Sequence, residues 1–348
     1  MKVNREELLK CLVSMSPGLS SRELIEQSSC IVCTEDGRLM TFNDEVCVSR
    51  QSPIPMKGAV KAKPLLELLS KLQEDEVDVE QEGPELRIKG KGRRAVIKME
   101  QSVLLPVDAV DVPDIWFPLP TDFLEAVHHV APCASTEESK FVWTCVHIAS
   151  DRVEASDRFQ IARFDVNTGF DSDTLIRAES LQRILGFDMS ECCETRSWVH
   201  FRNSEGLVIS VRKYEEQYPD VTKHVSVADT QPITLPAEIE DAVARADIFS
   251  SDADSTKNSL VHVEITEDLM LLRGIGIIGK YEEKKKIAYS GPDIKFLMPA
   301  SLLLSLSKKA KDCRVSKDKF YLESGKFRYV SSTMSKPPAP ATSAKKED

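Results

Sequence analysis

One amphipathic pattern occurs in three segments of this 348-residue chain, in the same register each time. In segment 236–249 the apolar residues follow the i, i+3, i+4, i+7 spacing of a helix with one buried face, and segments 120–130 and 5–15 repeat that spacing. The three sets are Leu8, Cys11, Leu12 and Met15; Phe123, Ala126, Val127 and Val130; and Ile239, Ala242, Val243 and Ala246. We therefore interpret the chain as one structural unit written three times.

A second predicted helix follows in each third of the chain, at 63–72, 177–186 and 299–306, with Leu65, Leu181 and Leu302 at corresponding positions. Segments that read as antiparallel strands separate the helices. The expected fold class is therefore α+β, with two helices packed on antiparallel sheet in each repeat. Proline-rich junctions at 112–119 and 218–235 predict domains at 1–115, 116–230 and 231–334, and the composition of 335–348 predicts a disordered tail.

Turn signals position the expected strands. Asp36-Gly37 predicts a hairpin between 30–33 and 39–42, Gly83-Pro84 a second between 76–80 and 85–89, and 203–206 a third. Single strands are expected at 141–148, 153–164 and 286–289.

The bulk composition narrows the class of protein. The chain is 41% hydrophobic and 29% charged, which is typical of a globular protein, and no apolar run approaches the roughly 20 residues of a membrane helix. No signal peptide is recognisable, and the nine cysteines follow no secreted framework, so we expect a cytoplasmic protein without membrane attachment. A net charge of −10 argues against a protein that coats nucleic acid over its whole surface, but permits a local basic lining.

Motifs for catalysis or metal binding are weak. Segment 274–279 matches G-x-G-x-x-G, but a lysine- and glutamate-rich strand follows it where a dinucleotide site needs a helix, so a glycine-bent strand is the favoured interpretation. Cys30 and Cys33 lack a second pair of zinc ligands. His128 lies on the predicted outer face of its helix, and His129 has no carboxylate partner in the sequence, so we interpret both as solvated. We expect no catalytic residue, no metal and no cofactor, with a nucleotide-dependent enzyme as an alternative.

Basic residues gather in or beside the predicted helices, while acidic residues crowd the strands and turns. Solvated helix faces explain any one of them, but the collective asymmetry could instead face a polyanion through phosphate contacts. The candidates are Lys10, Arg22, Lys63, Lys71, Arg177, Arg183, Arg245, Lys308 and Lys309, with Lys311 beside them.

The order of helices and strands, together with several local motifs, resembles the bacterial DNA polymerase III beta subunit, the sliding clamp. Segments 4–10 and 19–22 resemble the opening of that family, and 155–162 stands where the family has a T-D-G-H-R-L-A-like strand. Segment 218–220 matches its F/Y-P-D, and 289–291 its Y-S/E-G.

The resemblance implies a DNA clamp fold in which three domains form half of a closed ring. Two copies would join head to tail as a homodimer, with helices lining a channel for duplex DNA and sheets facing outward. It also implies a processivity factor that is not an enzyme, and that tethers a DNA polymerase after an ATP-driven loader has placed it on DNA.

The family docks short peptides of polymerases and loaders in an apolar cleft between its second and third domains. The residues carried over to that cleft are Trp143, Ser156, Arg158, Phe159, Gln160, Ile161, Pro219, Lys223, His224, Val330, Ser332 and Met334. Ordinary strand core is the alternative interpretation for Phe159, Ile161 and Val330.

This chain departs from the family pattern at three places. Arg158-Phe159 replaces the usual G-H, Trp143 replaces an aliphatic cleft residue, and segment 332–334 replaces an M-P-M-R ending. Glu137 falls on a loop that touches DNA in the family and would repel phosphate, whereas Arg22 fits such a loop. The alternative function is a diverged scaffold of the same fold that does not encircle DNA.

Overall fold

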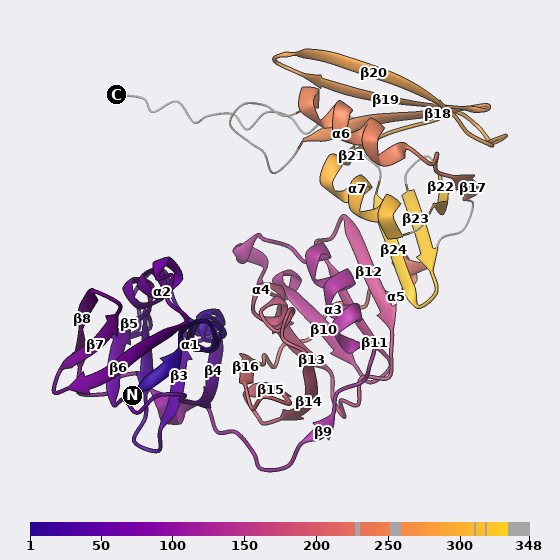
Figure 1. The fold of residues 1–348 in the computed structure, drawn as a ribbon. Coiled ribbons are helices and arrows are strands. Elements are labelled where there is room, and N and C mark those ends of the chain that lie inside the picture. The colour runs from indigo at the N-terminus through magenta and orange to yellow at the C-terminus, as the bar shows by residue number, and fades with distance from the viewer. Residues whose placement is uncertain (227–229, 251–258, 310, 317–318, 333–348) are drawn as a thin grey trace, which may run out of the picture. The chain divides into compact units, whose positions relative to one another are not determined.

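The computed structural model describes residues 1–226, 230–250, 259–309, 311–316 and 319–332 (Figure 1). It divides into two compact units, which are described separately. Unit 1 comprises Met1–Pro132, Thr144–Asp151 and Val166–Tyr218, and unit 2 comprises Cys133–Trp143, Arg152–Asp165 and Pro219–Asp348. The tail predicted at 335–348 lies outside the described residues, and the domain boundaries at 115, 230 and 334 stay predictions.

The same order of elements occurs three times: a strand, a helix, four strands, a second helix and three strands. The first series is β1 (Lys2–Asn4), α1 (Arg5–Val13), β2 (Cys30–Cys33), β3 (Arg38–Phe42), β4 (Val46–Gln51), β5 (Gly58–Lys61), α2 (Ala62–Lys71), β6 (Glu76–Glu82), β7 (Glu85–Gly90) and β8 (Arg93–Glu100). The second is β9 (Phe117–Pro118), α3 (Phe123–Val130), β10 (Cys145–Ala149), β11 (Arg152–Ser156), β12 (Gln160–Asp165), β13 (Thr174–Arg177), α4 (Ala178–Gln182), β14 (Met189–Glu194), β15 (Trp198–Asn203) and β16 (Val208–Arg212). The third is β17 (Gln231–Thr234), α6 (Ile239–Ser250), β18 (Leu260–Thr266), β19 (Leu269–Gly276), β20 (Gly279–Lys286), β21 (Ile294–Pro299), α7 (Ala300–Lys309), β22 (Asp312–Val315), β23 (Lys319–Ser324) and β24 (Phe327–Ser332), with a short helix α5 (Thr222–Val225) before it.

The predicted helix stripes are confirmed. All residues of the three sets are buried, and the first helices contact the second in each series, α1 with α2, α3 with α4 and α6 with α7. Leu65 and Leu181 are buried as predicted, but Leu302 is only half-buried, and Leu303 occupies the core instead. Helix α4 ends at Gln182, earlier than predicted, because the following turn closes with i→i+3 hydrogen bonds up to Leu185.

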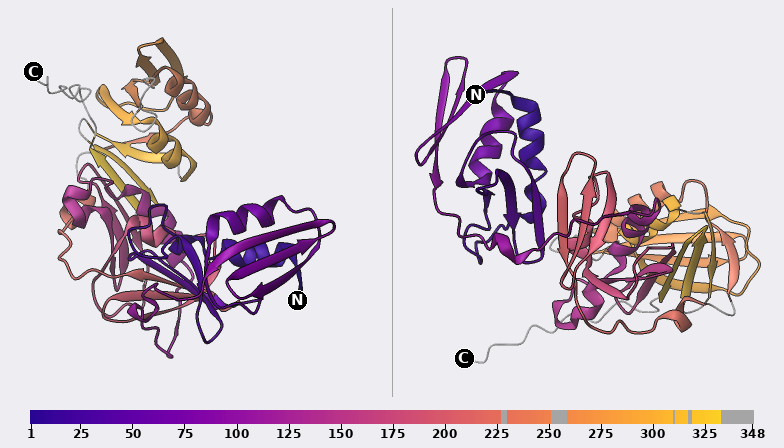
Figure 2. Two further views of the ribbon diagram at one scale, coloured as in Figure 1. Left: turned by 90° about the vertical axis from the view of Figure 1, so that its left-hand side faces the viewer. Right: turned by 90° about the horizontal axis from the view of Figure 1, so that it is seen from below.

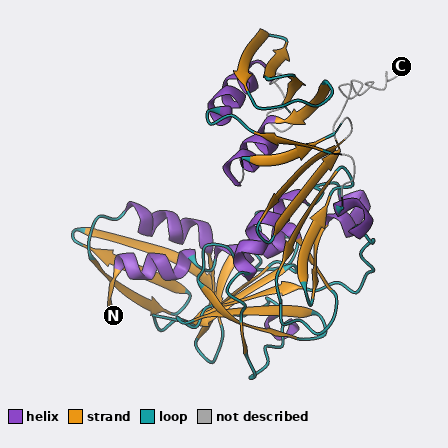
Figure 3. Ribbon diagram, turned by 90° about the vertical axis from the view of Figure 1, so that its right-hand side faces the viewer, coloured by secondary structure: helices purple, strands orange, loops and turns teal. Residues whose placement is uncertain are grey.

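A 12-stranded antiparallel sheet organises unit 1, in the order β1-β6-β7-β8-β5-β2-β3-β4-β16-β15-β14-β9. The helices α1 and α2 lie side by side along its N-terminal strands (Figures 2 and 3). The predicted hairpins at Asp36-Gly37 and Gly83-Pro84 are present, and Gly37 has the positive φ (79°) that this turn requires. Strands β10 and β13 pair with each other in the same unit.

The first and second series meet inside this sheet, where β4 pairs with β16 from Val46↔Val211 to Val208↔Ser49. The apolar cluster beneath the pairing includes Phe42 and Trp198, whose ring centroids are 6.1 Å apart. On its polar side, Arg177 lies 3.7 Å from the Glu45 carboxylate, and Arg212 pairs with Asp44. Both backbone pairing and side-chain burial therefore join the two series.

Unit 2 contains a run of antiparallel strands in the order β11-β12-β24-β23-β22-β17, and a four-stranded sheet in the order β20-β19-β18-β21. Here β12 of the second series pairs with β24 of the third, from Gln160↔Ser331 to Phe164↔Phe327. Helix α6 covers β18, β19 and β20, and α7 packs beside it (Figure 1).

Three of the expected strands are wrong in extent. Segment 153–164 is a hairpin, β11–β12, and not one strand, because Asp157 bonds the backbone of the two residues that follow Arg158 and so forms a tight turn. Residues 138–144 form a 3-10 helix before β10. The strand expected at 286–289 is not formed. Strand β20 ends at Lys286, and the next strand, β21, begins at Ile294.

The G-x-G-x-x-G segment is a strand hairpin, as favoured from the sequence. Gly274 and Gly276 end β19, and Gly279 begins β20. A Cβ atom at Gly274 would overlap the carbonyl oxygen of Ala246 in α6, so these glycines let the helix approach the strand. No helix N-terminus follows, and the dinucleotide interpretation fails on this context.

We predict that Gly274→Ala lowers the free energy of unfolding by about 2 kcal/mol, because α6 and β19 must separate to admit the methyl group. Ile275→Ala is the matched control, since that side chain is 48% exposed, and it should change stability by less than about 0.5 kcal/mol. Urea unfolding measures both. Equal effects of the two substitutions would contradict the close-approach explanation.

Candidate functional site

The basic candidates on the first helix pair are exposed. Lys10 lies on α1, with its Nζ 3.5 Å from Glu205, and Lys63 and Lys71 lie at opposite ends of α2. Arg22 is exposed in the loop before β2. These side chains can reach a polyanion without losing an interaction stronger than one exposed ion pair.

The arginine candidates are more strongly bound to their own chain. Arg177 is half-buried beside Glu45, and Arg183 pairs with Glu179 at 3.0 Å. Arg245 donates to the Tyr281 hydroxyl and to both oxygens of Glu283, all from β20. These bonds raise the pKa of Arg245 further, and they direct the side chain to the sheet. Lys308 is exposed on α7, whereas the side chain of Lys309 lies outside the described residues.

The candidate peptide cleft is formed around the turn between β11 and β12 in unit 2. The Ser156 hydroxyl accepts from the backbone N–H of Arg158, and Asp157 accepts from those of Phe159 and Gln160. Arg158 has a φ of 82°, in the left-handed region that favours glycine. Glycine would adopt this φ without steric strain, and glycine is the residue that the resemblance leads us to expect here.

Phe159 is 63% exposed at this turn, with the Arg158 guanidinium 5.7 Å from its ring centroid. Its exposure excludes the strand-core interpretation for this residue. Val330, in contrast, is buried, and Ile161, its partner in the β12–β24 register, is half-buried. The apolar candidates therefore divide into one exposed ring and a strand pair that is largely core.

The other cleft candidates lie close to this pairing. The backbone N–H of Ser332 donates to Phe159, and the Tyr329 hydroxyl donates to the Gln160 side chain at 2.9 Å. Helix α5, which carries Lys223 and His224, contacts both β12 and β24, and Thr222 at its start accepts from Arg163. Pro219, Lys223 and His224 are exposed.

Trp143 is half-buried at the end of the 3-10 helix, where its carbonyl accepts from Ser135. Glu137, from the same segment, lies 3.6 Å from Arg158, so this loop reaches the β11–β12 turn. Met334 lies outside the described residues. The other cleft candidates all come from unit 2.

A buried ion pair behind the turn escaped the sequence analysis. Arg163 and Glu154 are both almost fully buried and pair at 2.6 Å, while Arg328 on the neighbouring strand pairs with Asp165. Beside them is a 470 Å³ pocket lined by Arg163, Thr222, Val225, Ser226, Arg314, Tyr321, Glu323 and Arg328. These residues have no common spacing in the sequence, because only the strand register brings them together.

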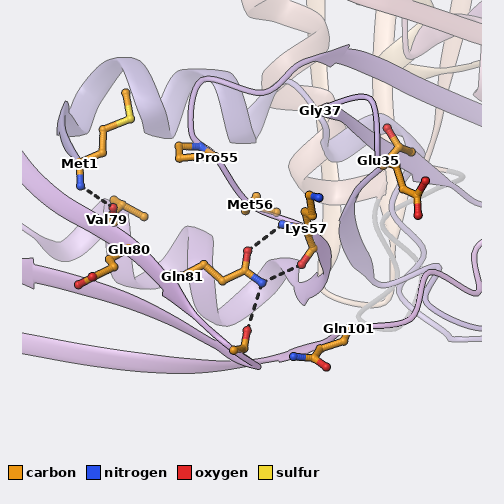
Figure 4. A pocket seen from close by; sticks show the side chains of 12 residues that line it. Met1, Glu35, Gly37, Pro55, Met56, Lys57, Val79, Glu80, Gln81 and Gln101 are labelled. Atoms are coloured by element: carbon orange, nitrogen blue, oxygen red, sulfur yellow. Dashed lines mark hydrogen bonds between the residues drawn. The ribbon is translucent and has the colours of Figure 1, made fainter.

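A larger pocket of 860 Å³ lies in unit 1 (Figure 4). Met1, Pro55, Met56 and Val79 form apolar walls, and the side chain of Gln81 bonds the backbone N–H and carbonyl of Lys57. Because Gln81 is already engaged with backbone, its role is to anchor the loop before β5. None of the sequence-predicted site residues lines this pocket.

The described residues were searched for side-chain groups that could hold a metal ion or act as a nucleophile or base. No group of three or more His, Cys, Asp or Glu side chains there is placed to hold a metal ion. All nine cysteines are buried, and burial raises the pKa of Cys47, Cys145 and Cys313 to about 12, which suppresses the reactive thiolate. His128 is exposed, and the ring of His129 bonds the carbonyl of Glu125. Across the described residues, no helix is both long and apolar enough to cross a membrane.

Comparison with solved structures shows the fold. Over 96% of its length the chain matches the DNA polymerase III beta chain from Streptococcus pneumoniae, with a TM-score of 0.78, 19% identity and 98% of that chain covered. The sliding clamp from Bacillus subtilis gives a TM-score of 0.73 at 17% identity, over 97% of this chain and 99% of that one. A sliding clamp from Pseudomonas aeruginosa bound to griselimycin gives 0.77 at 15% identity, over 96% and 98%. The expected DNA clamp fold is therefore confirmed.

No protein-family model matches the sequence, and no curated protein does either. The likeness is thus one of fold, at low sequence identity, as expected for a diverged chain.

We predict that Arg158→Gly raises the free energy of unfolding by about 1 kcal/mol, because glycine adopts a φ of 82° without steric strain. Arg158→Ala separates this effect from loss of the side chain, and it should bring no such gain, since alanine keeps the strain and the Glu137 ion pair is exposed. Thermal unfolding compares the three proteins. A gain of the same size for alanine would show that the arginine side chain, and not its backbone, is unfavourable.

Proposed function

We propose that this protein is a DNA sliding clamp: a non-catalytic processivity factor that encircles duplex DNA as a head-to-tail ring of two copies. The fold match to DNA polymerase III beta chains over 96% of the sequence carries this proposal. The threefold order of elements supports it, because two copies would supply six equivalent series for a closed ring. The proposed location is the cytoplasm.

The charge distribution suits retention by enclosure. The net charge of −10 makes adhesion to DNA over the whole surface unfavourable, while Lys10, Lys63 and Lys71 keep exposed cations on the helices α1 and α2. A few mobile lysines can centre a duplex without the dense phosphate contacts that would hold it at one place. In this proposal Arg22, Arg183 and Lys308 add to the lining, whereas Arg177 and Arg245 contribute less, because Glu45 and Glu283 neutralise their charges.

The partner-binding part of the proposal rests on the β11–β12 turn. Phe159 offers an exposed aromatic anchor, and Lys223 and His224 on α5 offer a polar rim, which is the usual composition of a peptide-binding site. The proposed ligands are short peptides of a DNA polymerase and of the clamp loader. Arg158 beside the ring favours peptides with an acidic residue next to their apolar anchor.

We predict that the protein, once loaded, stays on nicked circular DNA during gel filtration in 0.5 M NaCl and is lost when the same DNA is cut once. Salt screens phosphate contacts, whereas a topological link has no such dependence. Equal loss from both DNA forms would contradict encirclement. The double variant Lys63→Ala, Lys71→Ala is the comparison for adhesion, and it should keep the difference between circular and linear DNA.

We predict that Phe159→Ala shortens the products of primer extension by the polymerase and loader of the same cell, whereas molecules of the variant that have been loaded stay on circular DNA as long as the unaltered protein does. The ring is 63% exposed, so its removal leaves the core intact. Ile277→Ala removes an apolar side chain that is 86% exposed in the β19–β20 turn, and it should leave product length unaffected. Normal product length with Phe159→Ala would exclude the turn as the docking site.

A further inference from the structure

Three arginines line the 470 Å³ pocket behind the β11–β12 turn, although the chain carries a net charge of −10. Strands β12, β24, β23 and β22 lie side by side in that order, and one face of them forms a wall of the pocket. Helix α5, with Ser226 after it, forms another wall. We call this cavity the arginine pocket, after Arg163, Arg314 and Arg328. All of its lining residues belong to unit 2.

The strand register brings the arginines onto one face. Arg163 lies opposite Arg328, which lies opposite Glu323 on its other side. Two residues before Glu323 in β23, Tyr321 lies opposite Arg314. Directly opposite residues of antiparallel strands share a face, and so do residues two apart in one strand, so these five side chains point to the same side. Like charges that lie opposite each other repel, so the Arg163–Arg328 pair needs a nearby anion.

Two of the arginines have a carboxylate partner that does not line the pocket. Glu154 pairs with Arg163 at 2.6 Å, and Asp165 pairs with Arg328. These carboxylates do not occupy every donor, because a guanidinium has five N–H groups. Nε of Arg163 donates to Glu154 and Nη2 to the Thr222 hydroxyl, whereas Nη1 donates to no described residue. Arg163 is only 7% exposed, so a ligand reaches its free donors through the pocket that it lines.

Arg314 is the third arginine, and it is exposed. It donates to the hydroxyl of Thr230 at 2.7 Å and to the carbonyl of the same residue at 3.3 Å. In the described part of the chain, no carboxylate forms an ion pair with Arg314. Glu323, the acidic residue of the pocket lining, instead accepts from the Tyr321 hydroxyl at 3.0 Å. The charge of Arg314 is therefore available to a ligand.

The charges favour a singly charged ligand. The three arginines are matched in number by the carboxylates of Glu154, Asp165 and Glu323, so a dianion would leave a larger excess of negative charge than a monoanion. A carboxylate also accepts guanidinium N–H groups in pairs. Burial and the hydrogen bond to Glu323 raise the pKa of Tyr321 to about 12, so its hydroxyl stays protonated near neutral pH and remains a donor. A carboxylate is therefore the ligand chemistry that the pocket fits best.

The pocket continues the candidate peptide cleft along the strands. Ile161 and Val330 form the next register pair on the same face as Arg163 and Arg328, two residues or about 7 Å away. Side chains i and i+2 of an extended peptide lie on one face at the same spacing. A peptide whose apolar residue lies over the first pair can therefore place an acidic residue, two positions along, in the arginine pocket. A volume of 470 Å³ suits a small organic group rather than a single ion.

We propose that the arginine pocket binds the carboxylate of an acidic side chain in a protein that docks on unit 2, through Arg314 and the free donors of Arg163 and Arg328. The bound carboxylate acts as the compensating anion between the three guanidinium groups. The source of this side chain rests on the proposed docking of partner peptides. The anion site itself does not rest on the proposed ring, because all of its residues come from one unit of one chain.

The test is a titration of the full-length protein, isotope-labelled in arginine, at low salt and neutral pH, with the Nε–H signals read by NMR. N-acetyl-glutamate α-amide is the probe for an acidic side chain, and acetate is the probe for a free carboxylate. The amide is expected to cause saturable shifts at Arg314, whose signal is assigned by its loss in Arg314→Gln, and to bind more tightly than acetate. Equal affinity for the two probes would overturn the side-chain site, and shifts that do not saturate would overturn any anion site here.

Two substitutions at the pocket should act in opposite directions. Arg314→Gln should weaken binding of the amide about 10-fold, because it removes a charged donor. Glu323→Gln should strengthen binding about threefold, because it removes a competing carboxylate and leaves the Tyr321 hydroxyl free to donate. Both positions are exposed, so neither change leaves a buried charge unpaired, as Arg163→Gln would at Glu154.

Arg196→Gln is the matched control. It removes an arginine charge from unit 1, in the turn between β14 and β15, where the side chain of Arg196 is 89% exposed. It should leave the affinity for the amide unchanged, and thermal unfolding verifies that each variant is folded. Unchanged affinity in Arg314→Gln, or equal weakening by Arg196→Gln, would overturn the proposed site, as would weaker binding in Glu323→Gln.

Discussion

Antiparallel pairing between the last strand of one series and an edge strand of the series before it is the constraint on which the structure depends. In unit 1 it joins β4 to β16, and in unit 2 it joins β12 to β24. Each pairing extends a sheet across a series boundary and buries aromatic side chains, Trp198 in the first case and Tyr329 in the second. The same type of contact therefore joins the first series to the second and the second to the third.

The charged residues divide into groups that are paired within the chain and groups that stay exposed. Charged side chains at the boundaries between series form ion pairs within the chain, as Arg163 does with Glu154 and Arg212 with Asp44. The exposed lysines of α1 and α2 remain available for solvent or a polyanion. A net charge of −10 does not suit a protein that holds DNA by adhesion to a dense basic surface, and this is why the proposed function relies on enclosure.

The sequence predicted the helices well because their signal is local. The stripe from Phe123 to Val130 is fully buried, as its 3.6-residue period requires, and the hairpin at Asp36-Gly37 follows from turn chemistry. The turn at Arg158 was missed, because arginine at a positive φ carries no signal in a single sequence. The Arg163–Glu154 pair was missed for another reason. Charged residues are usually exposed, so the sequence predicts neither as buried, and only the register of β11 and β12 brings the two together.

The candidate site was predicted unevenly for the same reasons. Lys63 and Phe159 are exposed, as a binding role requires. The sequence did not predict that Arg245 pairs with Glu283, because α6 contacts β20 only in the folded protein. The resemblance predicted a cleft between the second and third domains, and the structure assigns the described cleft candidates to unit 2.

The number of subunits in solution tests the account most directly. If the chain forms a ring of two copies, sedimentation velocity should show a dimer at micromolar concentration that dissociates on dilution. A monomer at every concentration would contradict the account.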